Sequence, residues 1–488
     1  MKTLVIGLDG AAPDLLFGDE SLTNIRHLME NGSFGRLESI VPPITVPAWM
    51  CMATSQDPGS LGVYGFRNRV DHSYGNLSIV NSRSIQDFAI WDQIAREGGK
   101  SIILGVPPSY PPRKINGICV GCFLTPDTST NPYTHPASIK DEISRLVGDY
   151  AVDVKGFRTD QKDWLKAETF AMTAKRFQVI RHLMAEHEWD YFQFVEIGLD
   201  RMQHGFWKHH DPEHVLHEPG NEFQDTLREY YRYLDYELGR VLELLDDDTT
   251  VVVMSDHGGQ KLDGGFCVNE WLVREGLLVL NSPPDQVTPF QKLDVDWDRT
   301  RVWSEGGYYA RVFFNVRGRE PRGVIDPLDY ERFRDEIKAK FEATVDEHGR
   351  LLGTSVYKPE QIYRSVKNVA PDLIVHFGDL SWRSIGGVGY GAIHVQENDT
   401  GPDDCNHAQF GSFILASPRS PMHGQIHGAH LLNVAPTLLE LGGYDLPNTM
   451  QGTSMMSGAE LATVASAGFE GTDEEIIRER LSGLGYVG

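Results

Sequence analysis

The chain alternates short apolar runs with longer segments of helical period. Residues 2–8 (KTLVIGL), 191–197 (YFQFVEI), 250–255 (TVVVMS) and 412–417 (SFILAS) are short, apolar and rich in β-branched or aromatic residues, which predicts buried strands. Helices are predicted at 14–31, 88–99, 164–187, 223–245 and 430–441. Strands that alternate with long helices predict an α/β fold, with a mostly parallel central sheet covered by helices on both faces.

The pattern changes between residues 260 and 400, where Gly, Pro and short mixed segments replace the strand–helix alternation. We predict that this span is an inserted α+β cap that governs substrate selectivity. The catalytic core is then formed by 1–259 and 401–456. The tail, 457–488, is rich in small residues and then charged, and its last part predicts a short helix.

Composition narrows the range of partners. Hydrophobic residues make up 40% of the 488 residues, enough for a large core, and the net charge is −24. Because the chain has no Lys/Arg run to overcome this negative field, bulk nucleic-acid binding is not expected. A small phosphoester held by metal ions remains compatible with the charge. The Gly387–Ala392 segment fits GxGxxA but lacks a preceding strand and a following helix, so we interpret it as a loop.

The N-terminus and the cysteines predict a cytoplasmic protein. The apolar run in MKTLVIGLDG is too short for a signal peptide, and no run approaches the ~18 apolar residues of a membrane span. The five cysteines are scattered, as is typical of a reducing compartment. Cys119 and Cys122 form a lone CxxC pair in an apolar run, which we interpret as buried strand thiols.

Three of the predicted strands end on an aspartate: Asp9, Asp200 and Asp256. Ligands of open α/β sheets bind beyond the carboxyl ends of the strands, so these side chains are expected to meet there. Three carboxylates at one point repel one another unless a cation neutralises them. Two histidines accompany them. His257 follows Asp256 directly, and His204 lies four residues after Asp200, which one helical turn would place on the same face.

Each of these pieces alone has a structural explanation. A strand-end Asp often caps the next helix, and Asp-His-Gly is an ordinary turn. Their recurrence at equivalent positions favours metal binding instead. Asp and His ligands suit Zn²⁺, with Mn²⁺ or Fe²⁺ as alternatives. Four or five ligands exceed one catalytic zinc site, so we predict two divalent metal ions, ~4 Å apart.

Thr45, in the stretch PPITVPAW, is the candidate nucleophile. Prolines 42, 43 and 47 restrict the backbone around it, and a helix is predicted to begin just after it. The helix dipole and a metal ion would both favour an alkoxide at this hydroxyl. The alternatives are that Thr45 only caps the helix and that a bound water is the nucleophile.

Several stretches together resemble the alkaline phosphatase superfamily, and within it the type I phosphodiesterase/nucleotide pyrophosphatase branch. They occur in the family's order and span nearly the whole chain, apart from the cap and the tail. The stretches are GLDG (7–10), ITVPAWMCMATSQDPGSLGVYGF (44–66), GLDRMQHGFW (198–207), SDHGG (255–259), NHAQFGSFILASP (406–418) and GAHLLNVAPTLLELGG (428–443).

The resemblance implies a full ligand set for two metal ions. Asp9, Asp256, His257 and the Thr45 hydroxyl would surround one ion. The other would be bound by Asp200, His204 and His407, of which His407 follows only from the resemblance. Thr45 would attack phosphorus in line and form a covalent phospho-threonine, which water would then release. The implied function is hydrolysis of a small-molecule phosphoester, by a phosphodiesterase or a phosphatase.

The chain departs from the family pattern at three places. Relatives have Thr-Gly at Thr54-Ser55, often His at Leu61, and, in nucleotide pyrophosphatases, a phosphoryl-contacting Asn at the place of Phe66, with Asn68 only nearby. The ligand set is unaffected, but a nucleotide diester is not supported as substrate. A mutase similar to cofactor-independent phosphoglycerate mutase, and a non-catalytic metal-binding protein, are the alternative functions.

Overall fold

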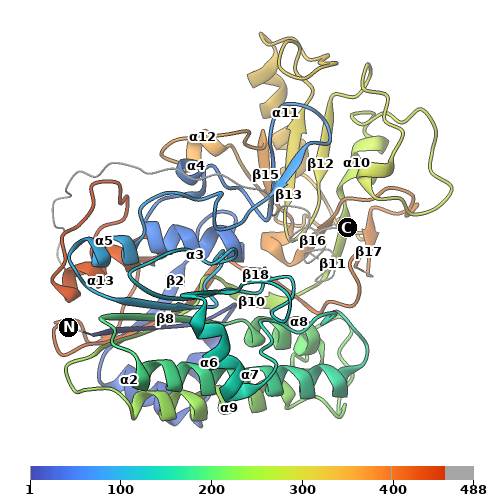
Figure 1. Ribbon diagram of the computed structural model, residues 1–488. Helices are drawn as coiled ribbons and strands as arrows, with labels where there is room; N and C mark the ends of the chain where they lie inside the picture. Colours follow the sequence, from blue (N-terminus) through green and yellow to red (C-terminus); the bar gives the residue numbers. More distant parts are fainter. Residues whose placement is uncertain (1, 397, 457–488) are drawn as a thin grey trace.

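A ten-stranded sheet forms the centre of the computed structural model, which describes residues 2–396 and 398–456 (Figure 1). The strand order is β20-β2-β19-β9-β1-β8-β5-β6-β7, and β21 also pairs with β2. The strands are β1 (Thr3–Leu8), β2 (Ser33–Glu38), β5 (Ser101–Leu104), β6 (Gly117–Val120), β7 (Thr134–His135), β8 (Tyr191–Glu196), β9 (Thr250–Met254), β19 (Phe410–Ala416), β20 (Gly424–Gln425) and β21 (Ala429–His430).

The sheet is mostly parallel, as predicted. Strands β6, β5, β8, β1 and β9 run parallel to their neighbours, whereas β19 is antiparallel to both β9 and β2, and β7 to β6. Strands β1, β8 and β9 are buried along their whole length. This burial on both faces explains why their sequences are continuous apolar runs rather than alternating ones.

Helices cover both faces of the sheet. In Figure 1, α2, α7 and α9 lie below it and α3, α5 and α13 lie above it. Among the described residues, no helix is both long and apolar enough to cross a bilayer. The helices of the core are α1 (Pro13–Gly18), α2 (Thr23–Glu30), α3 (Thr45–Thr54), α4 (Pro58–Leu61), α5 (Ile90–Arg96), α6 (Ser138–Val147), α7 (Lys162–Glu186), α8 (Gly198–His210), α9 (Thr226–Leu242) and α13 (Val434–Gly442).

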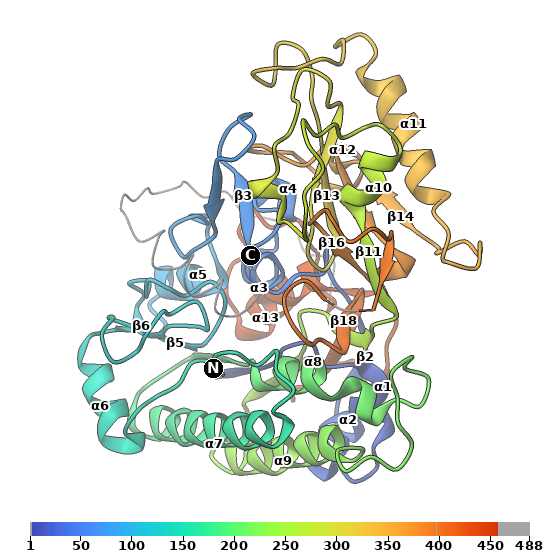
Figure 2. The ribbon, with the colours of Figure 1, turned by 90° about the vertical axis from the view of Figure 1, so that its right-hand side faces the viewer.

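The segment between β10 (Gly258–Lys261) and β18 (Cys405–Ala408) forms the upper lobe in Figures 1 and 2. These two strands pair with each other, so the chain leaves and re-enters the core at one point. The lobe has two small sheets. One consists of β11 (Gly264–Cys267), β16 (Trp382–Ile385) and β17 (His394–Val395), and the other of β12 (Val302–Glu305), β13 (Ala310–Phe314), β14 (Ser355–Tyr357) and β15 (Leu373–His376). Its helices are α10 (Val268–Arg274), α11 (Tyr330–Glu342) and α12 (Pro359–Ile362).

The lobe has its own hydrophobic cluster, whose buried members lie between Phe266 and Phe377. Tyr308, Tyr309 and Tyr363 instead pack into the main cluster around the central sheet. Both smaller sheets and the cluster fall inside the predicted cap range. The domain boundaries themselves stay a prediction, and the predicted helix of the tail lies outside the described residues.

The structure corrects three local predictions. Asp200 does not end a strand: β8 ends at Glu196, and Asp200 is the third residue of α8. The helix can begin there because Gly198 fits where a side chain would meet the Tyr230 hydroxyl at 2.2 Å. The helix predicted at 14–31 is two helices, α1 and α2, and Thr45 is the first residue of α3 rather than a residue before it.

Gly7 lets α3 pack tightly onto β1, and we expect Gly7→Ala to destabilise the fold. A Cβ at this position would lie 2.5 Å from the ring of Trp49 and 2.9 Å from the Phe194 carbonyl oxygen. Overpacking of this kind costs about 1–3 kcal/mol. Gly18→Ala is the control, since no atom lies within 4 Å of its Cβ. Urea unfolding of the two variants checks this, and equal free energies of unfolding would contradict it.

Candidate functional site

The segments that follow β1 and β9 bring Asp9, Asp256 and His257 to one edge of the central sheet. The two strands are parallel neighbours, so their carboxyl ends lie side by side. All three side chains are buried completely. Thr45, at the N-terminus of α3, completes the group, because its Oγ1 lies 3.2 Å from His257 Nε2. The structure thus brings together the four residues predicted for one metal ion.

The orientation of the His257 ring turns a lone pair toward the carboxylates. Nδ1 donates to the Gly258 carbonyl at 3.0 Å, which leaves Nε2 of the neutral ring unprotonated. Nε2 lies 3.3 Å from Asp256 Oδ2 and 3.7 Å from Asp9 Oδ1. Within the described residues, these two buried oxygens accept no hydrogen bond. Ligand atoms bound at about 2.0–2.1 Å in a tetrahedron lie about 3.3 Å apart, so the spacing fits a Zn²⁺-sized cation.

Asp200, His204 and His407 form a second group. Asp200 and His204 lie one turn apart in α8, with Oδ1 of Asp200 3.2 Å from Nε2 of His204 and 3.9 Å from Nε2 of His407. The Nδ1 atom of His407 donates to the Pro43 carbonyl at 2.8 Å, so its Nε2 again has a free lone pair. In the described part of the chain, this buried Nε2 has no hydrogen-bond partner. The donor atoms of each group lie within 4.8 Å of one another, so each group could hold a metal ion.

The two groups form one continuous site. The antiparallel pairing of β10 with β18 places Gly259 opposite His407, which puts that histidine beside His257. The two imidazole rings stack with centroids 3.7 Å apart and planes at 15°. The structure therefore assembles every residue that the sequence singled out for metal binding: Asp9, Thr45, Asp200, His204, Asp256, His257 and His407.

The electrostatics of the site reflect the crowding of like groups away from water. Burial raises the pKa of Asp9 well above its usual value, and the charge of Asp200 raises it further. Burial and then the charge of Asp9 raise the pKa of Asp256 in the same way. Burial lowers the pKa of His257 to about 4 and that of His407 well below its usual range. A bound cation would stabilise the charged form of the two carboxylates. Because both imidazoles are neutral, no proton has to leave them before a cation binds.

Asp403 is a residue of this site that the sequence analysis missed. Its Oδ1 lies 2.6 Å from His204 Nδ1, and its Oδ2 pairs with Arg158 at 3.0 Å and Arg383 at 3.2 Å. A carboxylate behind a histidine fixes the ring so that Nε2 faces the metal. The sequence holds no local signal for this role, because Asp403 lies 199 residues from His204 along the chain.

Two further side chains hold the carboxylates in place. Trp49 Nε1 donates to Asp9 Oδ2 at 2.9 Å and thereby leaves Oδ1 for a ligand. Arg201, buried completely, donates to Asp200 and forms two bonds of 2.9 Å with Asp153. Trp49 and Arg201 lie within stretches that the sequence analysis quotes, but the sequence does not indicate which atoms their side chains contact.

The place where the family pattern expects a phosphoryl-contacting Asn is filled differently. Phe66 lines a pocket beside Ile44, the residue before Thr45. Asn68 is buried and serves the loop instead: its Oδ1 accepts from the Tyr64 amide at 2.7 Å, and its Nδ2 donates to the Gly65 carbonyl at 3.2 Å. An aromatic ring therefore stands where an amide was expected.

Comparison with known proteins adds a family and a fold. The family model described as type I phosphodiesterase / nucleotide pyrophosphatase matches residues 3–403, a range that includes six of the seven predicted ligands and ends four residues before His407. Comparison of the sequence with curated proteins gave no significant match.

Solved structures resemble the fold over nearly its full length. Murine ectonucleotide pyrophosphatase/phosphodiesterase 5 is 14% identical, with 91% of this chain and 95% of that chain covered and a TM-score of 0.51. The human protein is 13% identical, with coverages of 94% and 97% and a TM-score of 0.52. Phosphonoacetate hydrolase from Sinorhizobium meliloti 1021, solved with phosphonoformate, is 15% identical, with coverages of 91% and 95% and a TM-score of 0.58. At these identities the likeness shows the fold, and it confirms the predicted alkaline-phosphatase-like architecture.

Removal of metal with a chelator is expected to lower the melting temperature more at pH 8 than at pH 5. In the metal-free protein the raised pKa values of Asp9 and Asp256 mean that folding takes up protons, so stability falls as pH rises above the usual value of 3.8 through the raised values. Metal binding relieves this penalty and itself strengthens as protons leave the ligands. Calorimetric scans with and without chelator at both pH values measure the difference. A loss that is equal, or larger at pH 5, would contradict this account.

Asp403→Asn is expected to weaken metal binding about 10- to 100-fold, because it removes the charge that orients His204. Asp404→Asn is the matched control: Asp404 is also buried, but it pairs with Lys208 at 3.3 Å. Competition with a chromogenic chelator gives both affinities. Equal losses in the two variants would mean that Asp403 acts only through general stability.

Proposed function

The chain belongs to the type I phosphodiesterase/nucleotide pyrophosphatase family, whose members are phosphoric ester hydrolases, and we propose that it hydrolyses a small phosphoester with two divalent metal ions and a threonine nucleophile. Asp9, Thr45, Asp256 and His257 would hold one ion, and Asp200, His204 and His407 the other. The mixture of carboxylate and imidazole ligands favours Zn²⁺.

One observation supports this proposal above all others. Buried electron pairs of Asp9 Oδ1, Asp256 Oδ2, His257 Nε2 and His407 Nε2 converge beside the Thr45 hydroxyl, and three of these atoms accept no hydrogen bond in the described residues. Leaving such atoms bare costs about 1–3 kcal/mol each, and more for charged groups. The cost is recovered when a cation binds, which explains why the arrangement persists in a folded core.

The position of Thr45 suits a nucleophile. It is 1% exposed and begins α3, where the positive end of the helix dipole favours an alkoxide and a bound phosphoryl group. Ile44, the residue before it, is extended, and the Thr45 hydroxyl lies 3.2 Å from His257 Nε2. Bound metal ions would supply Lewis-acid stabilisation of the charge on the phosphoryl oxygens and the leaving group.

The proposed reaction has two steps. Thr45 Oγ1 forms a bond to phosphorus as the bond to the leaving-group oxygen breaks, and the leaving group takes up the proton that the hydroxyl loses. Water then attacks the phospho-threonine, the bond from phosphorus to Oγ1 breaks, and Thr45 regains a proton. The residues around it contribute by orientation: Trp49 fixes Asp9, and Asp403 fixes His204.

The lobe at 260–400 is proposed to select the substrate. Tyr308, from the lobe, stacks on His407 with ring centroids 4.0 Å apart, and its hydroxyl lies 3.5 Å from His204 Nε2. A substrate at Thr45 would therefore be enclosed by lobe side chains. The predicted cytoplasmic location stays a prediction; the five cysteines are all free and buried.

Thr45→Ala is expected to lower turnover of bis-p-nitrophenyl phosphate or p-nitrophenyl phosphate by at least ~10³-fold while the variant still binds about two equivalents of metal. Thr45→Ser, which keeps a hydroxyl, should retain measurable activity. Release of p-nitrophenol and the metal content of the purified variants are the measurements. Full activity of Thr45→Ala would show that water is the nucleophile, and the ratio of the two substrates separates a diesterase from a monoesterase.

A further inference from the structure

A small arginine-lined pocket borders the candidate site, because its lining includes Ile44, the residue before Thr45, and Tyr308, which stacks on His407. It has a volume of about 40 Å³ and begins at Ile44, whose Cα is one residue, ~3.8 Å, from that of Thr45. Three arginines line it, one from β3 (Arg67–Arg69) and two from the lobe: Arg67, Arg311 and Arg383. This pocket is not part of either metal-ligand group.

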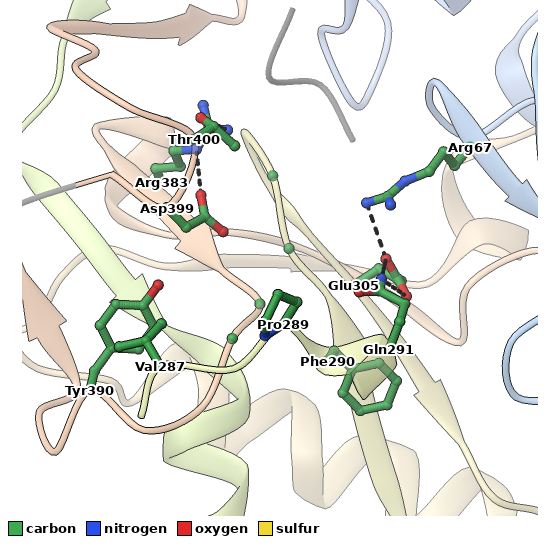
Figure 3. A pocket seen from close by; sticks show the side chains of 14 residues that line it. Arg67, Val287, Pro289, Phe290, Gln291, Glu305, Arg383, Tyr390, Asp399 and Thr400 are labelled. Atoms are coloured by element: carbon green, nitrogen blue, oxygen red, sulfur yellow. Dashed lines mark hydrogen bonds and ion pairs between the residues drawn. The ribbon is translucent and has the colours of Figure 1, made fainter. Parts of the chain in front are cut away.

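A second, larger pocket of about 210 Å³ continues outward from the first (Figure 3). The two share four lining residues, Arg67, Gly306, Gly307 and Arg383. Figure 3 shows Arg67 and Arg383 on opposite sides of the larger pocket, with Pro289 and Phe290 between them. Together the pockets extend from Ile44, the residue before Thr45, to the loops of the lobe, and their volume suits a small ligand only.

The arginines differ in how their charge is compensated. Arg67 pairs with Glu305 at 3.3 Å, and Arg383 pairs with Asp403 at 3.2 Å. Arg311 is 6% exposed and donates through one Nη to the Arg67 carbonyl; within residues 2–396 and 398–456, no carboxylate lies within 4.0 Å of its guanidinium. A guanidinium stays protonated in proteins, and a buried charge without a counter-ion is costly.

The net charge of the chain makes the buried cation of Arg311 significant for substrate binding. The whole chain has a net charge of −24, so its field repels an anionic substrate, and binding one requires concentrated positive charge at the site. The metal ions would neutralise the negative charge of the reacting phosphoryl group. Arg311 is outside both metal-ligand groups and lines the pocket that Ile44 and Tyr308 also line, where a second group of the substrate could bind.

We infer that Arg311, flanked by Arg67 and Arg383, binds a second anionic group of the substrate. The substrate class is then a small phosphoester or phosphonate that carries a carboxylate or a second phosphoryl group in addition to the phosphoryl group that reacts. The inference rests on the proposed function for the position of the reacting group. It adds a charge requirement that explains why Phe66, rather than an amide, can line the pocket: the polar recognition comes from guanidinium groups.

The test uses metal-loaded protein and non-hydrolysable ligands of matched length. Propylphosphonate has one anionic group, 3-phosphonopropionate replaces its terminal methyl with a carboxylate, and ethane-1,2-diylbisphosphonate offers a second phosphoryl group. Isothermal titration calorimetry should show that at least one of the two doubly anionic ligands binds about tenfold or more tightly than propylphosphonate. Which one binds tighter distinguishes a carboxylate from a phosphoryl group.

Arg311→Met should remove this preference and leave the affinity for propylphosphonate within about twofold. Arg317→Met is the matched control, because Arg317 is exposed, pairs with Asp326 at 3.3 Å and lines neither pocket, so the preference should persist. If Arg311→Met fails to fold, Arg311→Gln replaces it in the same comparison, because an amide can still donate to the Arg67 carbonyl but carries no charge.

Equal affinities of the three ligands for the unmodified protein would overturn the inference and would assign Arg311 the structural task of holding β3 through the Arg67 carbonyl. That result together with phosphoester hydrolysis would leave the proposed function intact. A tenfold preference that Arg311→Met abolishes, in a protein without hydrolytic activity, would support the anion site and contradict the proposed function instead.

Discussion

Three buried carboxylates that meet three imidazoles at one edge of the sheet are the constraint around which this structure is organised. Burial, and then the charge of the neighbouring carboxylates, raises the pKa of Asp9 and Asp256, and buried oxygen and nitrogen lone pairs are left without donors among the described residues. Such a cluster is stable in a folded core only if protons or cations occupy it. The backbone carbonyls that bind Nδ1 of His257 and His407 turn the remaining nitrogens inward, so the site presents lone pairs that a cation could bind.

The architecture follows from this constraint. Parallel strands β1 and β9 end side by side and supply one group of ligands, while α8, which starts immediately after β8, supplies most of the other. The pairing of β10 with β18 does two things at once, since it closes the base of the lobe and sets His407 against His257. The lobe in turn contributes Tyr308, whose ring stacks on His407, and two of the three arginines that line the smaller pocket.

Much of this could be predicted from the sequence, for identifiable reasons. Apolar runs that end on Asp9 and Asp256 are local signals, and the spacing of Asp200 and His204 is a helical one, so these residues could be found one segment at a time. His407 could not be found this way, because its neighbour is set by a strand pairing nearly 150 residues apart, and only the family resemblance singled it out. Asp403, Trp49 and Arg311 were missed because their roles depend on which atom each side chain faces. Ser55, where relatives have Gly, shows the same limit: it adopts a left-handed conformation with φ 52°, and its hydroxyl donates to the Leu432 carbonyl at 2.6 Å.

The position of bound metal tests the central claim most directly. Crystals of the protein grown with Zn²⁺ or Mn²⁺ and measured at the absorption edge of the metal would locate each ion by its anomalous scattering. This account predicts two peaks ~4 Å apart, one among Asp9, Asp256, His257 and Thr45 and the other among Asp200, His204 and His407. A single peak, or peaks outside these two groups, would contradict it.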